Sequence, residues 1–337
     1  MNKKVINACV VGYGAIGPVH AGVIDEIEDA KLFGICDMDT EKLKEARGKY
    51  DVKVYNSFSQ VLEDREVEVV HICTPHYLHV PMATAAMKSG KDVVLEKPAA
   101  MNSDEFSLLE QTVEETGRKV CFVLQNRTNN SVAEMKKQFD NPENGRLLGI
   151  EGSMHWCRTE KYYNSATWRG RWDTEGGGVL INQAVHLLDL FVYLGGEIKS
   201  VSASISTKLL GNCIEVEDTA EGLLFFKNGV RGCFYATNTY SSNKPFRIEI
   251  EYENVIYRYA DNRLYKITDD VEIVAVDNKN FPGKGCWGSG HKNVISQFYH
   301  SLIYGGEYID LKNGKNTMKA MFAFYESAKN KGVNVKL

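Results

Sequence analysis

The chain has 337 residues with 40 basic and 44 acidic side chains, a formal net charge of −4. This balance offers no strongly basic surface, so neither nucleic acid nor an anionic membrane is an expected partner. No apolar run approaches the roughly 20 residues that a membrane span needs, and the first apolar run starts too early to leave room for a signal peptide. We expect a cytoplasmic protein of two domains.

The eight cysteines do not predict a disulfide framework. Cys9, Cys36, Cys73 and Cys121 each lie inside an apolar run, as small buried hydrophobic residues do when they stay reduced in the cytosol. The sequence has no Cys-x-x-Cys and no paired Cys/His spacing, so no metal site is expected.

Residues 1–124 alternate between apolar, strand-like runs and helical stretches with short connections. This alternation predicts an α/β domain with a doubly wound parallel sheet. Asn102 and Glu105 suggest a capping box for a helix that ends at Gly117. The expected strands cover residues 5–11, 31–36, 67–73, 92–95 and 119–124, and the expected helices cover 15–27, 40–49, 77–89 and 103–116.

Residues 125–337 have a different sequence pattern, in which runs of β-branched and aromatic residues are separated by short turns. They predict an α/β domain whose sheet is large, mostly antiparallel and covered by helices on one face only. An open face of this kind suits a subunit interface, so we expect a homodimer or homotetramer. The expected strands cover residues 199–207, 218–226, 230–239, 246–252, 254–259 and 271–276, and the expected helices cover 179–194, 291–304 and 315–330.

The first apolar run leads into the glycine motif Gly12-x-Gly14-x-x-Gly17. Gly12 permits a tight turn, Gly14 lets the backbone approach a pyrophosphate, and Gly17 lets the next helix pack closely. The second apolar run ends at Asp37, whose carboxylate can accept hydrogen bonds from both hydroxyls of an unphosphorylated ribose. The motif therefore predicts a dinucleotide site that favours NAD over NADP; the alternative is a glycine-rich turn with a solvated Asp37.

Glu96-Lys97-Pro98 follows the strand expected at 92–95, at the sheet edge where such folds bind ligands. A lysine there can hydrogen-bond a substrate hydroxyl and favour the alkoxide character that hydride departure requires. From this tripeptide alone, a solvated lysine at a strand end is the alternative.

A second cluster follows the triplet at 176–178, where Asn182, His186 and Asp189 recur at spacings of four and three. In a regular helix these three side chains share one face. Histidine is the side chain best suited to take a proton near neutral pH. His186 is therefore either a general base or a core histidine in a satisfied hydrogen-bond network.

Together these motifs resemble those of the glucose-fructose oxidoreductase and inositol dehydrogenase family, and the match covers nearly the whole chain. The resemblance implies a Rossmann domain, a second domain with an open sheet, and a substrate pocket between the two. It also implies that Lys97 holds the substrate hydroxyl beside the nicotinamide and that His186 accepts the proton. The residues that match the cofactor motifs, with their neighbours, are Gly12, Gly14, Ala15, Ile16, Gly17, Asp37, Thr74, Pro75, His79, Glu96 and Lys97.

Asn182 departs from the family pattern, because many members carry aspartate at that position. An amide cannot accept a proton or orient an imidazolium by its charge. Either His186 works without a carboxylate at that position, and the catalytic role of Asn182 is only to position a hydroxyl, or Asp189 supplies the missing charge from one helical turn away. An asparagine at this position resembles the situation in the nucleotide-sugar and glycoside 3-dehydrogenase-like branches of the family.

Aromatic and polar residues between the expected start of the second domain and the glycine triplet are candidate sugar contacts. Aromatic faces suit the C–H side of a pyranose, and arginine, asparagine and tyrosine hydrogen-bond its hydroxyls. Trp168 and Trp172 are alternatively packing residues. The better candidates are Asn126, Arg127, Tyr162, Tyr163 and Arg169.

These observations predict an NAD-dependent oxidoreductase that transfers hydride between nicotinamide and a secondary hydroxyl or ketone of a sugar, glycoside or cyclic polyol. One alternative is a sugar-active enzyme whose NAD stays bound and is recycled internally. The other is a regulatory protein that only senses the dinucleotide.

Overall fold

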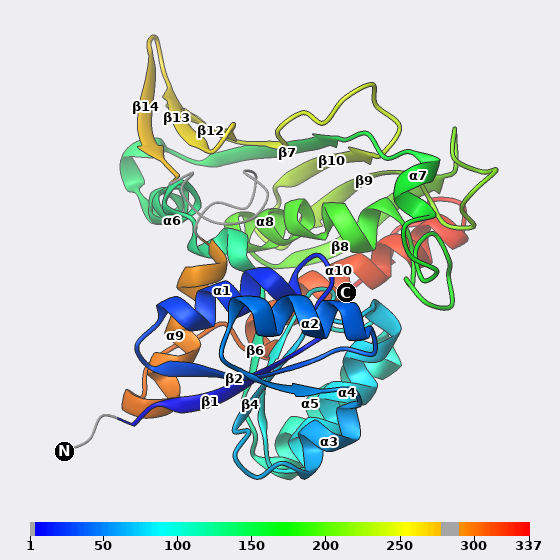
Figure 1. Ribbon diagram of the computed structural model, residues 1–337. Helices are drawn as coiled ribbons and strands as arrows, with labels where there is room; N and C mark the ends of the chain where they lie inside the picture. The colour runs from blue at the N-terminus through cyan, green and yellow to red at the C-terminus, as the bar shows by residue number, and fades with distance from the viewer. Residues whose placement is uncertain (1–3, 278–289) are drawn as a thin grey trace. The chain divides into compact units, whose positions relative to one another are not determined.

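The computed structural model describes residues 4–277 and 290–337, which form two compact units (Figure 1). The first unit contains Met1–Gln125 and His291–Asn313, and the second contains Asn126–Gly290 and Gly314–Leu337. Each unit has its own sheet, and each is described separately below.

The first unit is built on a six-stranded sheet in the order β3-β2-β1-β4-β5-β6, with every neighbouring pair parallel. The order reverses direction between β1 and β4, which is the place where doubly wound sheets bind ligands. The strands are β1 (Ile6–Val11), β2 (Ala30–Cys36), β3 (Lys53–Tyr55), β4 (Val69–Ile72), β5 (Asp92–Leu95) and β6 (Val120–Phe122).

Helices cover both faces of this sheet, with α1 and α2 on one side and α4 and α5 on the other (Figure 1). The predicted cap is present: the Asn102 side chain accepts a hydrogen bond from the Glu105 N–H (2.9 Å), and Gly117 ends the helix at a φ of 64°. The helices are α1 (Gly17–Glu26), α2 (Thr40–Lys49), α3 (Phe58–Glu63), α4 (His79–Lys88), α5 (Ser103–Thr116) and α9 (Gly290–Tyr304), the last belonging to this unit from His291 onward.

The parallel sheet and its helices agree with the prediction, but two short elements were missed. β3 has three residues and α3 has six, too few for a hydrophobic period to stand out. The four cysteines predicted to be buried, Cys9, Cys36, Cys73 and Cys121, are buried and free.

The second unit is built on a nine-stranded sheet in the order β14-β13-β12-β11-β7-β10-β9-β8-β15. Only the β10–β7 pair is parallel, and the other neighbours are antiparallel. The strands are β7 (Leu147–His155), β8 (Ile198–Ser206), β9 (Thr219–Phe226), β10 (Arg231–Thr237), β11 (Arg247–Tyr252), β12 (Ile256–Ala260), β13 (Arg263–Ile267), β14 (Val271–Val276) and β15 (Val335–Lys336).

Helices pack on one face of this sheet (Figure 1). Of the three helices expected there, the one at 291–304 belongs to the first unit instead, as α9. A Cβ at Gly152 of β7 would lie 2.5 Å from the Phe191 ring, and a Cβ at Gly222 of β9 would lie 2.8 Å from the Phe324 ring. Glycine on the sheet therefore lets the two aromatic rings approach the backbone. The helices of this unit are α6 (Asn130–Lys137), α7 (Glu160–Tyr163), α8 (Val185–Gly195) and α10 (Leu311–Lys329), the last counted here from Gly314 onward.

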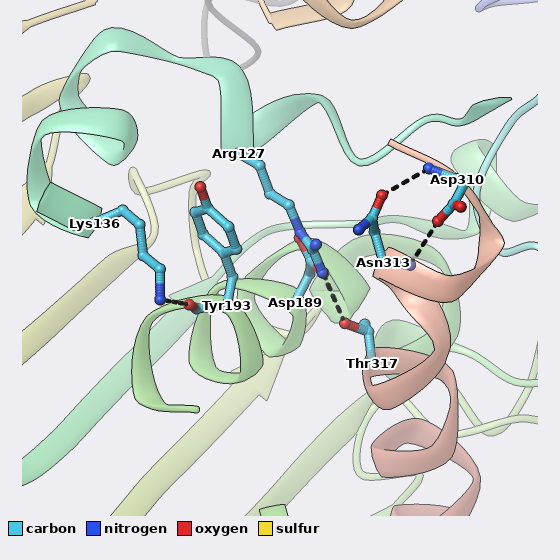
Figure 2. A network of polar contacts seen from close by, with 7 residues as sticks. All are labelled: Arg127, Lys136, Asp189, Tyr193, Asp310, Asn313 and Thr317. Atoms are coloured by element: carbon cyan, nitrogen blue, oxygen red, sulfur yellow. Dashed lines mark hydrogen bonds and ion pairs between the residues drawn. The ribbon is translucent and has the colours of Figure 1, made fainter. Parts of the chain in front are cut away.

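α10 begins with a reciprocal cap between Asp310 and Asn313. The Asn313 side chain accepts from the Asp310 N–H, and the Asp310 side chain accepts from the Asn313 N–H, both at 2.9 Å (Figure 2). This arrangement satisfies backbone donors that a helix start otherwise leaves open.

The helix predicted at 179–194 differs in its first turns. Leu180–Ala184 form a π-helical segment before α8, so the regular spacing assumed for Asn182 and His186 does not hold there. The prediction also missed β7, β13, β15, α6 and α7. Across the described ranges, no helix is both long enough and apolar enough to cross a membrane.

Candidate active site

The glycine motif of the first unit has the geometry that a dinucleotide requires. Gly12 has a φ of +92°, and a Cβ there would lie 2.6 Å from the Cys73 carbonyl oxygen. A Cβ at Gly17 would lie 2.1 Å from the Gly12 carbonyl oxygen, so only glycine lets α1 start this close to the turn. Gly14 faces open space, with no atom within 4 Å of a Cβ placed there. The turn fits a pyrophosphate at the N-terminus of α1.

Asp37 follows β2 and is held by the glycine turn itself. Its Oδ2 accepts a hydrogen bond from the Tyr13 N–H (2.7 Å), and its Oδ1 accepts one from the Asp39 N–H (2.9 Å). Lys42 lies 3.7 Å from the same carboxylate. The acid predicted to hold the ribose is therefore fixed directly beside the residues that would hold the pyrophosphate.

His79, the first residue of α4, joins two loops at the sheet edge. Its Nδ1 lies 2.7 Å from the Pro98 carbonyl oxygen and its Nε2 lies 2.9 Å from the Thr74 carbonyl oxygen. The ring is buried, which lowers its pKa. His79 thus ties the Thr74-Pro75 loop to the Glu96-Lys97-Pro98 loop. The buried Thr74 hydroxyl has no hydrogen-bond partner among the described residues, which suits a loop that faces a cofactor.

Glu96 lies at the end of a buried chain of hydrogen bonds that the sequence did not reveal. Its Oε1 is 3.0 Å from His20 Nε2, His20 Nδ1 is 2.8 Å from His71 Nδ1, and His71 Nε2 is 2.7 Å from the Tyr299 hydroxyl. With both rings neutral, the chain has one direction: Tyr299 donates to His71, His71 donates to His20, and His20 donates to Glu96.

The pKa directions agree with this chain. Burial lowers the pKa of both His20 and His71, and burial raises the pKa of the Tyr299 hydroxyl, so both rings stay neutral and the phenol stays protonated. Burial alone would raise the pKa of Glu96, but hydrogen bonds from His20 and His291 hold it well below its usual range. The Lys97 N–H donates to the other Glu96 oxygen (3.1 Å), so an ionised, oriented carboxylate supports the backbone of Lys97.

His20, Glu96 and His291 also bring ligand-type atoms within 4.8 Å of one another, although no metal site was expected. His291 Nε2 lies 3.5 Å from Glu96 Oε1. Both nitrogens of His20 already take part in the hydrogen-bond chain. The absence of a metal site stays a prediction.

The glycine triplet of the second unit packs against two other elements. A Cβ at Gly177 would lie 2.1 Å from the Tyr325 hydroxyl, and one at Gly178 would lie 1.9 Å from the Glu217 carbonyl oxygen. The buried Glu217 carboxylate accepts hydrogen bonds from the Gly178 N–H (2.9 Å) and the Leu180 N–H (3.0 Å). These contacts fix the start of the helical segment that carries Asn182 and His186.

Asn182 is paired with a buried carboxylate. Its Nδ2 donates to Glu175 Oε1, and the other Glu175 oxygen accepts from the Gly170 N–H. Glu175 is 1% exposed, Asn182 9% and His186 8%, so all three are buried. Sequence reasoning missed Glu175, and the only signal was its place directly before the triplet. A carboxyl group is therefore present near Asn182, one hydrogen bond away.

Asp189 does not supply that charge, because Arg127 and Thr317 engage it (Figure 2). Arg127 Nε lies 2.9 Å from Asp189 Oδ2, and the Thr317 hydroxyl donates to Asp189 Oδ1 at 2.7 Å. The Arg127 guanidinium also lies over the Tyr193 ring, 4.9 Å from its centroid. The prediction that Arg127 contacts sugar stays a prediction, and the observed contacts give its side chain a structural role.

Tyr162 and Tyr163 belong to a network that reaches the π-helical segment. The Asn238 side chain donates to Gln183 Oε1 (3.0 Å) and to the Tyr163 hydroxyl (3.1 Å). Gln183 Nε2 donates to the Tyr162 hydroxyl (3.1 Å). Arg169 also donates to the Tyr162 hydroxyl. Three of the five predicted sugar contacts, Tyr162, Tyr163 and Arg169, therefore lie together, next to Asn182. The fourth, Asn126, is buried with its Oδ1 unpartnered among the described residues.

Comparison with known proteins identifies both units. Residues 6–124 match the oxidoreductase family with an NAD-binding Rossmann fold, and residues 132–257 match the GFO/IDH/MocA C-terminal domain. The chain belongs to the GFO/IDH/MocA oxidoreductase family. It is therefore an NAD-binding oxidoreductase. The catalytic roles of Lys97 and His186 stay predictions.

The relatives are spread across the family. A levoglucosan dehydrogenase of Pseudarthrobacter phenanthrenivorans is 26% identical, over 81% of this chain and 80% of its own. A myo-inositol 2-dehydrogenase of Thermotoga maritima is 28% identical, over 66% of each chain. The solved structure of the WlbA dehydrogenase from Bordetella pertussis, in complex with NADH and UDP-GlcNAcA, is 28% identical and aligns over 99% of both chains with a TM-score of 0.87.

Proposed function

We propose that this protein is an NAD-dependent dehydrogenase that oxidises a secondary hydroxyl of a sugar, glycoside or cyclic polyol, or reduces the matching ketone. The observation that carries the proposal is the pairing of Asn182 with the buried Glu175 carboxylate, one turn before His186. The relatives named above act on sugars and inositols, according to their names.

NAD, when bound, supplies the hydride acceptor at its nicotinamide. Lys97 hydrogen-bonds the substrate hydroxyl and favours its alkoxide form, while His186 takes the hydroxyl proton. Asn182 donates to Glu175, and this hydrogen bond holds the side chain that positions a substrate hydroxyl. Glu96 supports the backbone at Lys97, and Asp37 selects an unphosphorylated ribose.

The test is NADH formation with a panel of inositols, aldoses, glycosides and nucleotide sugars. We expect one class to reduce NAD, and Lys97→Ala or His186→Ala to lower kcat/KM by about 10²- to 10⁴-fold with NAD affinity kept. Lys88→Ala, which removes an exposed lysine at the end of α4, is the matched control and should have no effect. Tight NAD binding with no NADH from any compound would contradict the proposal and favour a recycled cofactor or a sensor.

A second pair of variants tests the Asn182 pairing. Glu175→Gln keeps the shape but loses the charge-assisted hydrogen bond, so we expect kcat to fall about 10-fold with the fold intact. Asn182→Asp puts two carboxylates in contact, which raises the pKa of one of them and shifts the pH profile of kcat to higher pH. Unchanged kinetics in both variants would remove Glu175 from the mechanism.

We further propose a cytoplasmic homodimer or homotetramer formed through the open sheet face. On that face, Leu223 of β9 stands opposite Cys233 of β10, and Phe225 and Tyr235 lie beside them. Leu223 is 45% exposed, unusual for a central strand of a large sheet. Light scattering should give two or four chains per particle, and Leu223→Glu should dissociate them.

A further inference from the structure

Two arginines of the second unit converge on one tyrosine ring. The Arg169 guanidinium carbon lies 4.4 Å from the centroid of the Tyr162 ring, and that of Arg158 lies 5.0 Å from the same centroid. Each also lies over a tryptophan, Arg158 over Trp156 at 4.7 Å and Arg169 over Trp168 at 4.7 Å. We call Arg158, Arg169 and Tyr162 the arginine cluster.

Neither arginine has an acidic partner among the described residues. Arg158 donates to the Cys157 carbonyl oxygen and to the Asn243 side chain, and Arg169 donates to the Tyr162 hydroxyl. Arg171, two residues after Arg169, behaves differently, because it pairs with Asp173 at 3.4 Å and with Glu215 at 3.6 Å. The charge of the exposed Arg171 is therefore balanced by nearby acids, whereas the charges of the half-buried Arg158 and Arg169 are not.

The nearest acids of the loop are engaged elsewhere. Glu175 accepts from Asn182 and from the Gly170 backbone, and Glu160 accepts from Asn164 at 3.4 Å. Burial, with Lys244 nearby, lowers the pKa of His155 at the end of β7. Arg158 and Arg169 are two partly desolvated cations without a counter-ion, and such cations are costly to the fold.

The cluster also holds hydrogen-bond donors that protein groups do not use. The Nε atoms of Arg158 and Arg169 are both buried and have no acceptor within the described ranges. Tyr162 already accepts from Arg169 and from Gln183, whose orientation is fixed by Asn238, so the hydroxyl hydrogen of Tyr162 is left to donate. Two guanidinium edges and a phenol hydrogen suit an anion with several oxygens.

The cluster is joined to the proposed catalytic helix by single contacts. Tyr162 meets Gln183, the neighbour of Asn182, and the backbone after Arg169 meets Glu175, which holds Asn182. We therefore expect one substrate molecule to carry both the anion bound at the cluster and the hydroxyl held by Asn182 and His186.

We propose that Arg158, Arg169 and Tyr162 bind the anionic group, a carboxylate or a phosphate, of an acidic sugar substrate. This inference rests on the proposed function and narrows it. The neutral part of the sugar lies against Trp156 or Trp168, and the anion supplies the charge that the two guanidiniums lack.

The experiment uses three sugars that differ only at C6: D-glucose, D-glucuronate and D-glucose 6-phosphate. Their affinities for the NADH-loaded protein are measured by calorimetry, in the wild type and in Arg158→Gln, Arg169→Gln and Arg171→Gln. We expect at least one charged sugar to bind about 10- to 100-fold more tightly than glucose. The first two variants should lose that preference, and Arg171→Gln, the matched control, should keep it. The carboxylate and phosphate arms show which anion is preferred.

Equal affinity for all three sugars, or no binding of either charged one, would overturn the inference. So would a preference that survives in the Arg158→Gln/Arg169→Gln double variant. None of these results touches the proposed dehydrogenase activity, which fails only if no compound of the broader panel yields NADH. Circular dichroism of each variant confirms that the fold is kept.

Discussion

Arg127 and Asp189 form a buried ion pair with two hydrogen-bonded oxygens, and Thr317 donates to the same carboxylate (Figure 2). The arginine comes from the segment Gln125–Thr128, the aspartate from α8 and the threonine from α10. Three segments far apart in the sequence are therefore joined at one point of the second unit. The pair explains why a charge on α8 is not available to His186.

We expect Arg127→Met to destabilise the protein by about 3–5 kcal/mol, because it leaves the Asp189 carboxylate buried without its cation. The double variant Arg127→Met/Asp189→Leu should recover much of that loss, since neither charge is then buried alone. Urea unfolding followed by circular dichroism measures both. A stable Arg127→Met protein with a raised KM for sugar would instead support the predicted sugar contact.

Asp37 is expected to decide between the two nicotinamide cofactors. A 2′-phosphate would meet the carboxylate that the Tyr13 and Asp39 N–H groups hold in place. Asp37→Asn should therefore raise the ratio of kcat/KM for NADP to that for NAD by about 10-fold or more.

Asp39→Asn is the matched control for this change. Asp39 caps α2 by accepting a hydrogen bond from the Glu41 N–H, and an asparagine side chain can accept the same bond. The substitution therefore removes an exposed charge and leaves the ribose-binding carboxylate of Asp37 in place. Its cofactor ratio should stay as in the wild type. An equal change in both variants would mean that only the net charge of the loop matters.

Asp64 gives a stability change with pH. Its carboxylate accepts from Lys53, from the Tyr55 hydroxyl (2.8 Å) and from the Glu66 N–H (2.9 Å), and the Lys53 hydrogen bond chiefly lowers its pKa to about 2. A group with a depressed folded pKa contributes stability above its unfolded pKa, near 4, and that contribution is lost as pH falls toward 2. Because the pair is largely screened by solvent, the contribution is about 1 kcal/mol.

Asp64→Asn should therefore lower the free energy of unfolding by about 1 kcal/mol at pH 7 and have no effect near pH 2. Urea midpoints from pH 7 to pH 2 measure the difference between variant and wild type. Glu63→Gln, a neutralised exposed neighbour at the end of α3, should leave stability within about 0.5 kcal/mol at every pH. If the free energy of unfolding of Asp64→Asn is still below that of the wild type at pH 2, the side chain of Asp64 stabilises the protein through its shape and not through its charge.

The features that could be predicted from the sequence are those encoded by residues close together in the chain. The glycine turn, the Asn102 cap and the alternation of strands and helices are read from neighbouring residues, and the structure has them all. The sequence did not predict the partners that come from distant segments. Tyr299 and His71 are 228 positions apart in the sequence, and Arg127 and Asp189 are 62 apart. Hydrophobic periodicity contains no information about such distant pairs.

The site shows the same limit. Asn182 was placed on a regular helix because its neighbours are apolar and helical, but tertiary contacts at Gly178 and Leu180 start the segment as a π-helix. Glu175 precedes the glycine triplet and belongs to no motif, so only its burial and its bond to Asn182 reveal it. Arg158 differs from the paired Arg171 in its burial and in the acids that the fold brings near, and the sequence shows neither.

The buried set His20, Glu96 and His291 gives a last prediction, because two histidines and a glutamate are also ligands that zinc accepts. His20 uses both nitrogens in the chain from His71 to Glu96, and a metal would have to displace the proton that His20 donates. We therefore expect dialysis against a chelator to leave NAD affinity, turnover and melting temperature unchanged. Elemental analysis of the protein before and after dialysis is the accompanying measurement. The expectation is wrong if the protein holds one zinc ion per chain, loses thermal stability when dialysis removes that ion, and holds no zinc as the His291→Gln variant. The cluster would then be a metal site.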